Sequence, residues 1–250
     1  MSTAEQTASR LRELKLSAMA ESYERQREHP KLHDLSFDER FAMLVEQEWV
    51  ERDTRKLKRL LRVADLPETA VLEDVDHRAS RGLDKAQLAS LASCGWIRRQ
   101  QNLAILGPTG VGKTWLACAF ASQACRLRMH TTFYRASDLF NDIAIAALDG
   151  SLPKLKLQLA KASLLVLDDF GIGDMSTQVA HVLLEIVDRR MRTGSLLITS
   201  QYPTDKWHSF FPDPTIADAV LDRVVHQAHR ITLKGESMRK LRAKREMQAA

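Results

Sequence analysis

The sequence predicts an α/β protein in which a five-stranded parallel sheet follows a small all-helical N-terminal domain. In the C-terminal part of the 250-residue chain, short continuous apolar runs alternate with helical segments, which is typical of a parallel sheet covered on both faces. A glycine-rich octapeptide, residues 107–114, follows the first of these runs directly, as expected of a tight turn between a strand and a helix. Residues 1–66, by contrast, contain no glycine and repeat their apolar residues with a helical period.

Residues 1–66 form the first predicted domain, which is helical. Two sets of apolar residues have helical spacing, an early one of Leu11, Leu14 and Ala18 and a later one of Phe41, Leu44, Val45 and Trp49. The capping box Ser36-Phe-Asp-Glu39 predicts that a second helix begins there. Pro67 and the acidic stretch 68–76 indicate the end of this domain. Residues 67–100 are therefore predicted to be a linker with a helix that leads into the sheet.

Residues 101–250 form the second predicted domain, which ends in a basic tail. It contains five short runs that are rich in β-branched residues or leucine, each has the length of a short strand, and a helical segment separates one run from the next. In chain order, the predicted strands are 103–106, 131–135, 164–167, 196–199 and 230–233. This alternation favours parallel pairing, because parallel strands need a crossover connection that is usually a helix.

The octapeptide Gly107-Pro-Thr-Gly-Val-Gly-Lys113-Thr114 has the spacing GxxxxGK[ST] of a phosphate-binding loop. Its glycines let the backbone bend around an anion, and the next helix begins with its positive end at the same place. Lys113 is expected to reach the β- and γ-phosphates, and the Thr114 hydroxyl to bind Mg²⁺. A nucleoside triphosphate is therefore predicted to bind at Gly107, Pro108, Thr109, Gly110, Val111, Gly112, Lys113 and Thr114.

Polar side chains end the third and fourth predicted strands. The third runs into the adjacent carboxylates Asp168 and Asp169. In proteins with a phosphate-binding loop, one acid holds Mg²⁺ and a second can orient and deprotonate the attacking water, so Asp168 is assigned to the metal and Asp169 to the water. The fourth ends in Thr199-Ser200-Gln201. Because parallel neighbours end at the same edge of a sheet, Gln201 is expected to hydrogen-bond the γ-phosphate or the water.

Arg223 lies near the end of a helix that is predicted to begin around Thr215. An arginine in such a place commonly caps a helix or pairs with a carboxylate. The other role open to it is that of an arginine finger, which neutralises charge on the phosphoryl group of a nucleotide held by a neighbouring subunit. The residues by themselves leave both roles open.

The run 102–239 resembles the AAA+ ATPases and, among them, the IstB-like helpers of bacterial insertion sequences, which are related to the helicase loader DnaC and the initiator DnaA. The segments that carry the resemblance are GPTGVGKTWLA, LLVLDDFG, LLITSQYP and DAVLDRVVHQAHRITLKGESMRK, with a helical module before them. The resemblance implies that Gln201 is the sensor-1 residue, that Arg223 is the finger and that Arg239 is a sensor-2 contact. It also implies ATP as the nucleotide, a homo-oligomer on duplex DNA with ATP between subunits, and a transposase as the partner.

Three features depart from the general AAA+ pattern. Asp169 stands where a glutamate is usual, and Gln201 stands where an asparagine is commoner. A shorter carboxylate holds the water less well, so we expect slow ATP hydrolysis that DNA or a partner stimulates. Only seventeen residues follow Leu233, which are too few for a helical lid of ordinary length.

Three groups of basic residues are candidates for DNA binding, and one of them is the basic tail, residues 234–245. Arg52, Arg55, Lys56, Arg59 and Arg62 share a broad face of one helical stretch, and Lys154 and Lys156 lie between the second and third strands. They are either a solvated helix face or sequence-neutral contacts to phosphates. No aromatic residue alternates with the two lysines, which favours duplex over single-stranded DNA. The resemblance to DnaA-type initiators implies an added helical element over about residues 137–160.

The remaining composition narrows the class of protein. A net charge of +5 permits a nucleic-acid partner without establishing one. Three cysteines without a CxxC pair suit a reducing cytoplasm. No run approaches the ~18 apolar residues of a membrane span, so we expect a cytoplasmic protein without a membrane partner.

Three other functions stay open, namely a DnaC-like helicase loader, a small-molecule kinase, and a DNA-binding scaffold that holds ATP with negligible hydrolysis.

Overall fold

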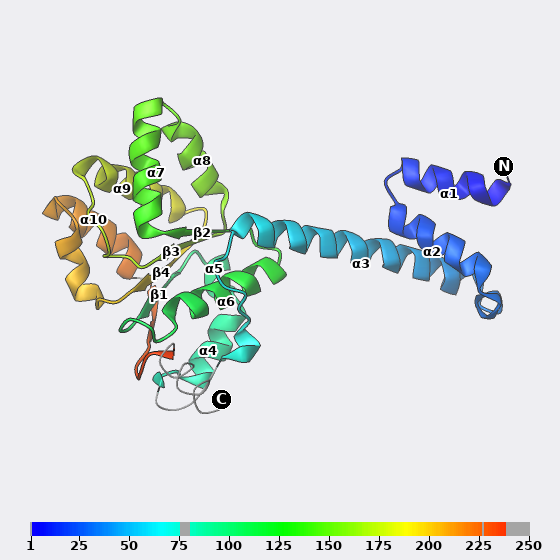
Figure 1. The fold of residues 1–250 in the computed structure, drawn as a ribbon, viewed down its shortest axis with the longest axis horizontal. Coiled ribbons are helices and arrows are strands. Elements are labelled where there is room, and N and C mark those ends of the chain that lie inside the picture. The colour runs from blue at the N-terminus through cyan, green and yellow to red at the C-terminus, as the bar shows by residue number, and fades with distance from the viewer. Residues whose placement is uncertain (1, 76–80, 227, 239–250) are drawn as a thin grey trace, which may run out of the picture. The chain divides into compact units, whose positions relative to one another are not determined.

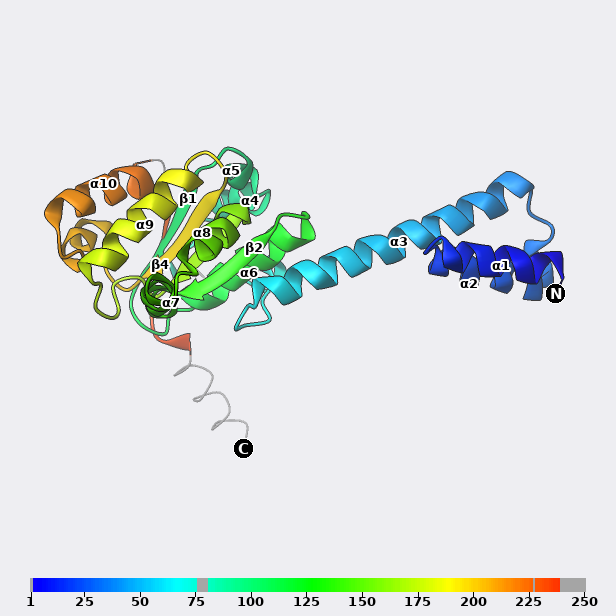
Figure 2. The same cartoon turned by 90° about the horizontal axis from the view of Figure 1, so that it is seen from above.

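The computed structural model describes residues 2–75, 81–226 and 228–238. Its chain divides into two compact units, residues 1–59 and 60–250. Figures 1 and 2 show a helical N-terminal part and an α/β C-terminal part. Each unit has its own architecture and is considered by itself.

The N-terminal unit contains α1 (Thr3–Glu13), α2 (Ser17–Glu28), the short η1 (Pro30–Leu32) and the first part of α3 (Phe37–Ala64). The expectation that Leu11, Leu14 and Ala18 share one helical face is wrong. Leu14 caps the end of α1 and is exposed, whereas Ala18 is buried in the next helix, α2. The reason is the backbone of Lys15, which has a φ of 61°. A left-handed residue interrupts a right-handed helix.

Helix α3 begins at the predicted capping box. The Glu39 N–H donates to Ser36 Oγ at 3.3 Å, and the Ser36 N–H donates to Glu39 Oε2 at 2.8 Å. The helix ends at Ala64, three residues before Pro67. Of its predicted apolar face, Leu44 is buried, but Phe41, Val45 and Trp49 are exposed.

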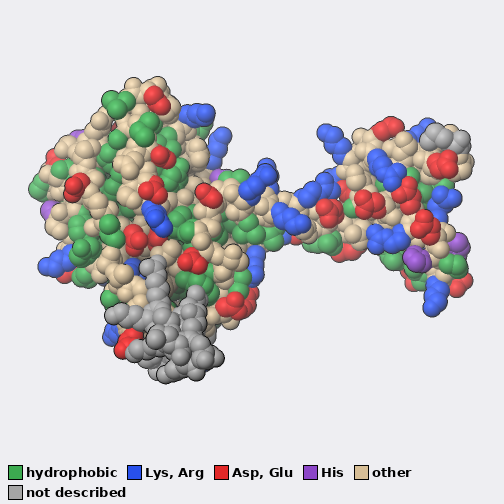
Figure 3. Space-filling view, viewed as in Figure 1, with side chains coloured by type: hydrophobic (Ala, Val, Ile, Leu, Met, Phe, Trp, Pro, Cys, Tyr) green, Lys and Arg blue, Asp and Glu red, His purple; other side chains and the backbone are tan. Residues whose placement is uncertain are grey.

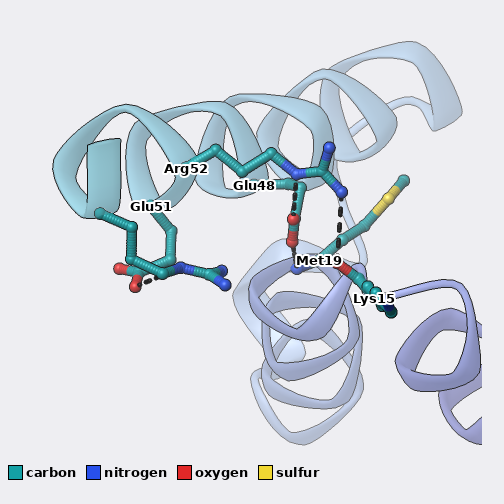
Figure 4. A network of polar contacts seen from close by, with 6 residues as sticks. Lys15, Met19, Glu48, Glu51 and Arg52 are labelled. Carbon is teal, nitrogen blue, oxygen red and sulfur yellow. Dashed lines mark hydrogen bonds and ion pairs between the residues drawn. The ribbon is translucent and has the colours of Figure 1, made fainter. Parts of the chain in front are cut away.

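A carboxylate in the middle of α3 forms hydrogen bonds with α2 and with a neighbouring arginine of α3 (Figure 4). Glu48 is only 6% exposed and accepts hydrogen bonds from the Met19 N–H at 3.1 Å and from Arg52 Nε at 2.7 Å. Arg52 Nη2 also donates to the Lys15 carbonyl at 3.2 Å. Arg52 is thus a structural link between α3 and the connection that follows α1.

The sheet of the C-terminal unit has five parallel strands in the order β2-β3-β4-β1-β5. The strands are β1 (Asn102–Leu106), β2 (Thr131–Arg135), β3 (Leu164–Asp168), β4 (Ser195–Ser200) and β5 (Ala228–Thr232). All five predicted strands are confirmed, although β5 begins two residues earlier than predicted. Because Leu106 lies opposite both Ser200 and Thr232, the carboxyl ends of β1, β4 and β5 meet at one edge.

Helices cover both faces of this sheet (Figure 1). On one face lie α7 (Ala136–Asp149), α8 (Leu152–Lys161), α9 (Thr177–Arg190) and α10 (Pro214–Val225), and on the other α6 (Lys113–Arg126), α4 (Lys85–Ala92) and α5 (Gly95–Arg98). The strand residues alternate accordingly, with Leu165 packed on the first layer and Val166 on the second. The described part of the unit also contains the short helices η2 (Leu72–Asp74) and η4 (Thr204–Phe210). The predicted α/β class is therefore confirmed.

The sequence predicts neither a membrane-spanning segment nor a helical lid of ordinary length after Leu233. None of the helices in the described ranges is long and apolar enough to cross a membrane. Of the seventeen residues after Leu233, the structure describes only 234–238, and these contain no complete helix. The rest of the basic tail lies outside the described residues.

Candidate nucleotide-binding site

The phosphate-binding loop connects the end of β1 to the start of α6, as its spacing predicts. Gly107 has a φ of +148°, and a Cβ there would come within 2.5 Å of the Leu233 carbonyl oxygen. The Leu233 N–H donates to the Leu106 carbonyl at 2.7 Å, so the segment after β5 passes directly along the loop. Gly112, at a φ of +93°, is the N-cap of α6. Only glycine adopts both conformations without strain.

The loop forms one wall of a cavity of about 390 Å³, a volume within the usual range of small-molecule sites. Predicted site residues on its wall are Thr109, Gly110, Gly112, Lys113, Thr114, Asp169 and Gln201. The wall also includes Glu68, Asp74, Arg81, Trp115, Ile172 and Met238, which the sequence did not single out. Arg81 Nη2 donates to the Val111 carbonyl at 2.7 Å, and its place in the linker carried no recognisable motif.

Lys113 is buried and points along its own loop. It is 5% exposed, and its Nζ donates to the Pro108 carbonyl at 3.0 Å. Burial lowers the pKa of its ammonium below the ordinary value, although the carboxylates of Asp169 and Asp168 oppose this shift. The carboxylates of Asp169 and Asp168 therefore favour the charged form of the Lys113 ammonium at the start of α6.

Thr114 and Asp168 fit a magnesium ion. Thr114 Oγ1 donates to Asp168 Oδ2 at 2.9 Å, and Asp168 is 1% exposed. Burial raises the pKa of Asp168, against hydrogen bonds from Thr199 and Thr114 that lower it. Among the described residues no three acid, histidine or cysteine side chains form a metal cluster. Two hard oxygen ligands suit Mg²⁺, which takes its other ligands from water and substrate phosphates.

The ends of β3 and β4 bring the remaining polar groups to this cavity. Asp169, directly after β3, has a φ of 56°, a conformation that Asp tolerates better than most residues. Thr109 Oγ1 donates to Gln201 Oε1 at 2.5 Å, which connects the phosphate-binding loop with the end of β4. The structure thus gathers Lys113, Asp169 and Gln201 around one cavity.

Comparison with known proteins identifies the family. The model of a family described as IstB-like ATP binding protein matches residues 9–247. This chain belongs to that family. It is 44% identical over 234 residues to a Sinorhizobium fredii (strain NBRC 101917 / NGR234) protein named as an insertion sequence ATP-binding protein, and the match covers 94% of this chain and 96% of the relative. It is 31% identical to an IS21 ATP-binding protein of Pseudomonas aeruginosa, with 92% and 86% covered.

Solved structures resemble the same IstB-like chain in fold. A crystal structure of DnaI matches with a TM-score of 0.57 at 21% identity, covering 71% of this chain and 94% of that one. The DnaC helicase loader gives 0.52 at 19%, covering 66% and 97%. AMPPCP-bound DnaA from Aquifex aeolicus gives 0.56 at 15%, covering 74% and 57%. These likenesses establish the AAA+ fold and nothing finer.

Arg223 of this IstB-like protein lies away from the cavity. Its guanidinium forms an ion pair with Asp188 of α9, and its Nη1 donates to the Ala219 carbonyl at 2.6 Å. Asn102, the first residue of β1, donates to the Arg223 carbonyl at 3.2 Å. Arg223 is therefore near the amino edge of the sheet, whereas the phosphate-binding loop follows the last residue of β1, roughly 13 Å along the strand. It lines a separate hollow of about 780 Å³ with Arg230.

The structure of the IstB-like chain thus shows the carboxylate pairing that the sequence left open for Arg223. Contact between this arginine and a nucleotide requires a second copy of the chain. Arg239, implied as a sensor-2 contact, lies outside the described residues. The last described residue, Met238, donates its N–H to the Gly110 carbonyl at 2.8 Å.

The basic residues proposed for DNA binding differ in their surroundings. On α3 all five predicted residues are exposed. Two of them, Arg52 and Arg55, also form ion pairs with Glu48 and Glu51 of the same helix. Figure 3 shows lysine and arginine side chains gathered along this part of the chain. Helices α7 and α8 occupy the place after β2 where an added element was expected. On α8, Lys154 is exposed, but Lys156 forms an ion pair with Glu185.

Proposed function

We propose that this IstB-like protein is a magnesium-dependent ATPase that assembles on duplex DNA and assists a transposase. The observation that carries the ATPase proposal is the single cavity shared by the phosphate-binding loop, Asp169 and Gln201. The transposition role rests on the family and on relatives named for insertion sequences. Residues 1–66 would then serve DNA and partner binding, residues 67–100 connect, and residues 101–250 form the ATPase.

In the proposed reaction, Lys113 leaves the Pro108 carbonyl and binds the β- and γ-phosphates. Thr114 and Asp168 would hold Mg²⁺, which would supply positive charge to the phosphate oxygens when bound. Asp169 accepts a proton from a water molecule whose oxygen attacks the γ-phosphorus, while the bond from that phosphorus to the bridging oxygen of ADP breaks. Gln201 orients this water. The products are ADP and inorganic phosphate.

The position of Arg223 supports the proposed assembly. Because this side chain lies near the amino edge of the sheet, away from its own phosphate-binding loop, a finger role requires the nucleotide of another protomer. ATP would then connect two copies, and its hydrolysis would weaken their contact. An arginine presented in this way neutralises charge on the transferred phosphoryl group.

DNA binding is proposed for the basic face of α3 and for α8. Exposed Lys56, Arg59, Arg62 and Lys154 are suited to contact phosphates. Arg52, Arg55 and Lys156 belong to the same two groups in the sequence, but they bind to carboxylates in the protomer. Contacts to phosphates alone would bind duplex DNA without reading its sequence.

The decisive experiment removes the Lys113 ammonium. We expect Lys113→Ala to abolish ATP binding in titration calorimetry while the protein still melts cooperatively. A suitable control is Lys85→Ala, because Lys85 is the exposed first residue of α4 and does not line the cavity. Wild-type affinity in Lys113→Ala would refute the nucleotide site. ATP binding by the wild type without phosphate release, even with duplex DNA, would instead favour the scaffold.

A further inference from the structure

The hydroxyl of Thr199 lies between the two carboxylate residues of the site. Thr199 is the fifth of the six residues of β4 and is completely buried. Its Oγ1 donates to Asp168 Oδ1 at 2.6 Å and accepts from the Asp169 N–H at 2.9 Å. A hydroxyl offers one donor and two acceptor lone pairs, so this one uses its only proton on Asp168 and a lone pair on the next residue.

The rest of the turn after β3 is also tied to the end of β4. The Phe170 N–H donates to the Thr199 carbonyl at 2.8 Å, and Ser200 Oγ donates to the Phe170 carbonyl at 2.6 Å. The Phe170 ring packs edge-on against Trp207 with centroids 5.0 Å apart. Asp169 is therefore held between two anchored residues. This fixation explains how its left-handed backbone persists, because such strained conformations persist only where the surrounding structure imposes them.

We propose that Thr199 is the positioning residue for both carboxylates of the ATPase site. This role of Thr199 rests on the ATPase function proposed above. Through Asp168 the hydroxyl orients the acid that, with Thr114, holds Mg²⁺. Through the Asp169 N–H it maintains the backbone conformation that presents the second carboxylate to the cavity. One side chain thus sets the position of the ion relative to the group that accepts the proton of water.

Packing alone does not call for this hydroxyl. Valine has nearly the same shape as threonine, and it is at least as favourable in a buried parallel strand. A hydroxyl at this buried position needs hydrogen-bond partners to offset its desolvation. Both of its partners belong to the two acids of the site. Outer hydrogen bonds of this kind commonly change metal affinity or activity by about 10–100-fold.

The test compares Thr199→Val, which removes the hydroxyl, with Thr199→Ser, which retains it. A matched control is Thr131→Val, the same substitution at a completely buried position at the start of β2. Each variant is checked by thermal melting. ATP affinity is then measured by calorimetry with Mg²⁺ and with EDTA, and kcat and KM are measured from phosphate release.

For Thr199→Val we expect wild-type ATP affinity in EDTA. The factor by which Mg²⁺ increases ATP affinity should be about 10–100-fold smaller than in the wild type, and kcat should fall by a similar factor. Thr199→Ser should recover most of both losses, and Thr131→Val should resemble the wild type. An unchanged magnesium gain in Thr199→Val would overturn the proposal, as would a Thr199→Ser variant as impaired as the valine variant. Equal loss in Thr131→Val would also overturn it, because general weakening of the sheet would then suffice. A different result, wild-type ATP affinity in Lys113→Ala, would refute the ATPase proposal itself.

Discussion

The carboxylate of Glu48 offers a quantitative test of how the N-terminal unit is held together. Glu48 is 6% exposed and accepts from the Met19 N–H and from Arg52 (Figure 4). Glu48→Gln keeps the size of the side chain but removes its charge. A hydrogen bond to a charged group contributes about 1.5–3 kcal/mol and a neutral one about 0.5–1.5 kcal/mol. With two bonds weakened, we expect α1 and α2 to lose about 1–2 kcal/mol of local stability.

Hydrogen exchange of the α1 and α2 amides measures this loss, because it reports local opening in the full chain. A loss of 1–2 kcal/mol should raise the exchange rates about 5- to 30-fold. The matched control is Glu51→Gln, one turn along the same helix. Glu51 pairs with Arg55 at 3.2 Å, with both side chains about half exposed, and such pairs contribute about 0.3–0.5 kcal/mol. Equal small changes in the two variants would refute the reasoning.

The same carboxylate predicts a dependence on pH. Burial raises the pKa of Glu48, but hydrogen bonds from Arg52 and the Met19 N–H outweigh it and hold the pKa below the ordinary 4.5. A lowered pKa in the folded state means that the contribution is complete above about pH 4.5 and is lost as the pH falls through the folded value. We expect protection of α1 and α2 to fall in this acid range in the wild type and to change less in Glu48→Gln. An identical acid response in both would exclude Glu48 as the titrating group.

The remaining predictions concern the ATPase site, the assembly and DNA. Asp169→Asn should retain ATP but lower kcat by about 10²–10⁴-fold, and unchanged phosphate release would reject Asp169 as the proton acceptor. Arg223→Ala should bind ATP as a protomer yet fail to assemble and lose about 10³-fold or more in kcat; normal sedimentation and turnover would leave this arginine its pairing with Asp188 alone. Arg59→Ala should weaken duplex binding and lower the slope of log K against log salt by about 0.9, and an unaltered slope would remove Arg59 from the interface. Arg52 is less suitable for that test, because its loss leaves Glu48 buried without its ionic partner.

Much of the fold follows from local patterns in the sequence. Continuous apolar runs predict β1, β3 and β4, since these strands are buried along their whole length. The spacing of the glycines before Lys113 predicts the turn of the phosphate-binding loop, because a backbone that bends around an anion needs residues without a Cβ. The capping box at Ser36 likewise depends on residues three apart and is confirmed. The predicted helical face that was to continue from Leu11 to Ala18 is wrong because the backbone of Lys15 is left-handed. This cause is local too, but a lysine does not indicate such a conformation in the sequence.

Contacts between distant segments could be known only from the folded chain. Gln201 contacts Thr109 across 92 residues, and Thr199 contacts Asp168 across 31. Local patterns indicate that each of these residues lies near the end of a strand or in the loop that follows one. Only the order of the strands in the sheet decides which of these ends are neighbours. The pairing of Arg223 with Asp188 depends in the same way on how α10 packs against α9.

The sequence by itself therefore determined the strands, the phosphate-binding loop and the identity of the candidate site residues, because these depend on spacing within a few residues. Tertiary structure alone decided which hydroxyl forms hydrogen bonds with Asp168 and the Asp169 N–H, which basic side chains are bound to carboxylates, and at which edge of the sheet Arg223 lies. The physical reason is that a side chain's partner is set by the packing of segments far apart in the chain, and no local pattern encodes that packing.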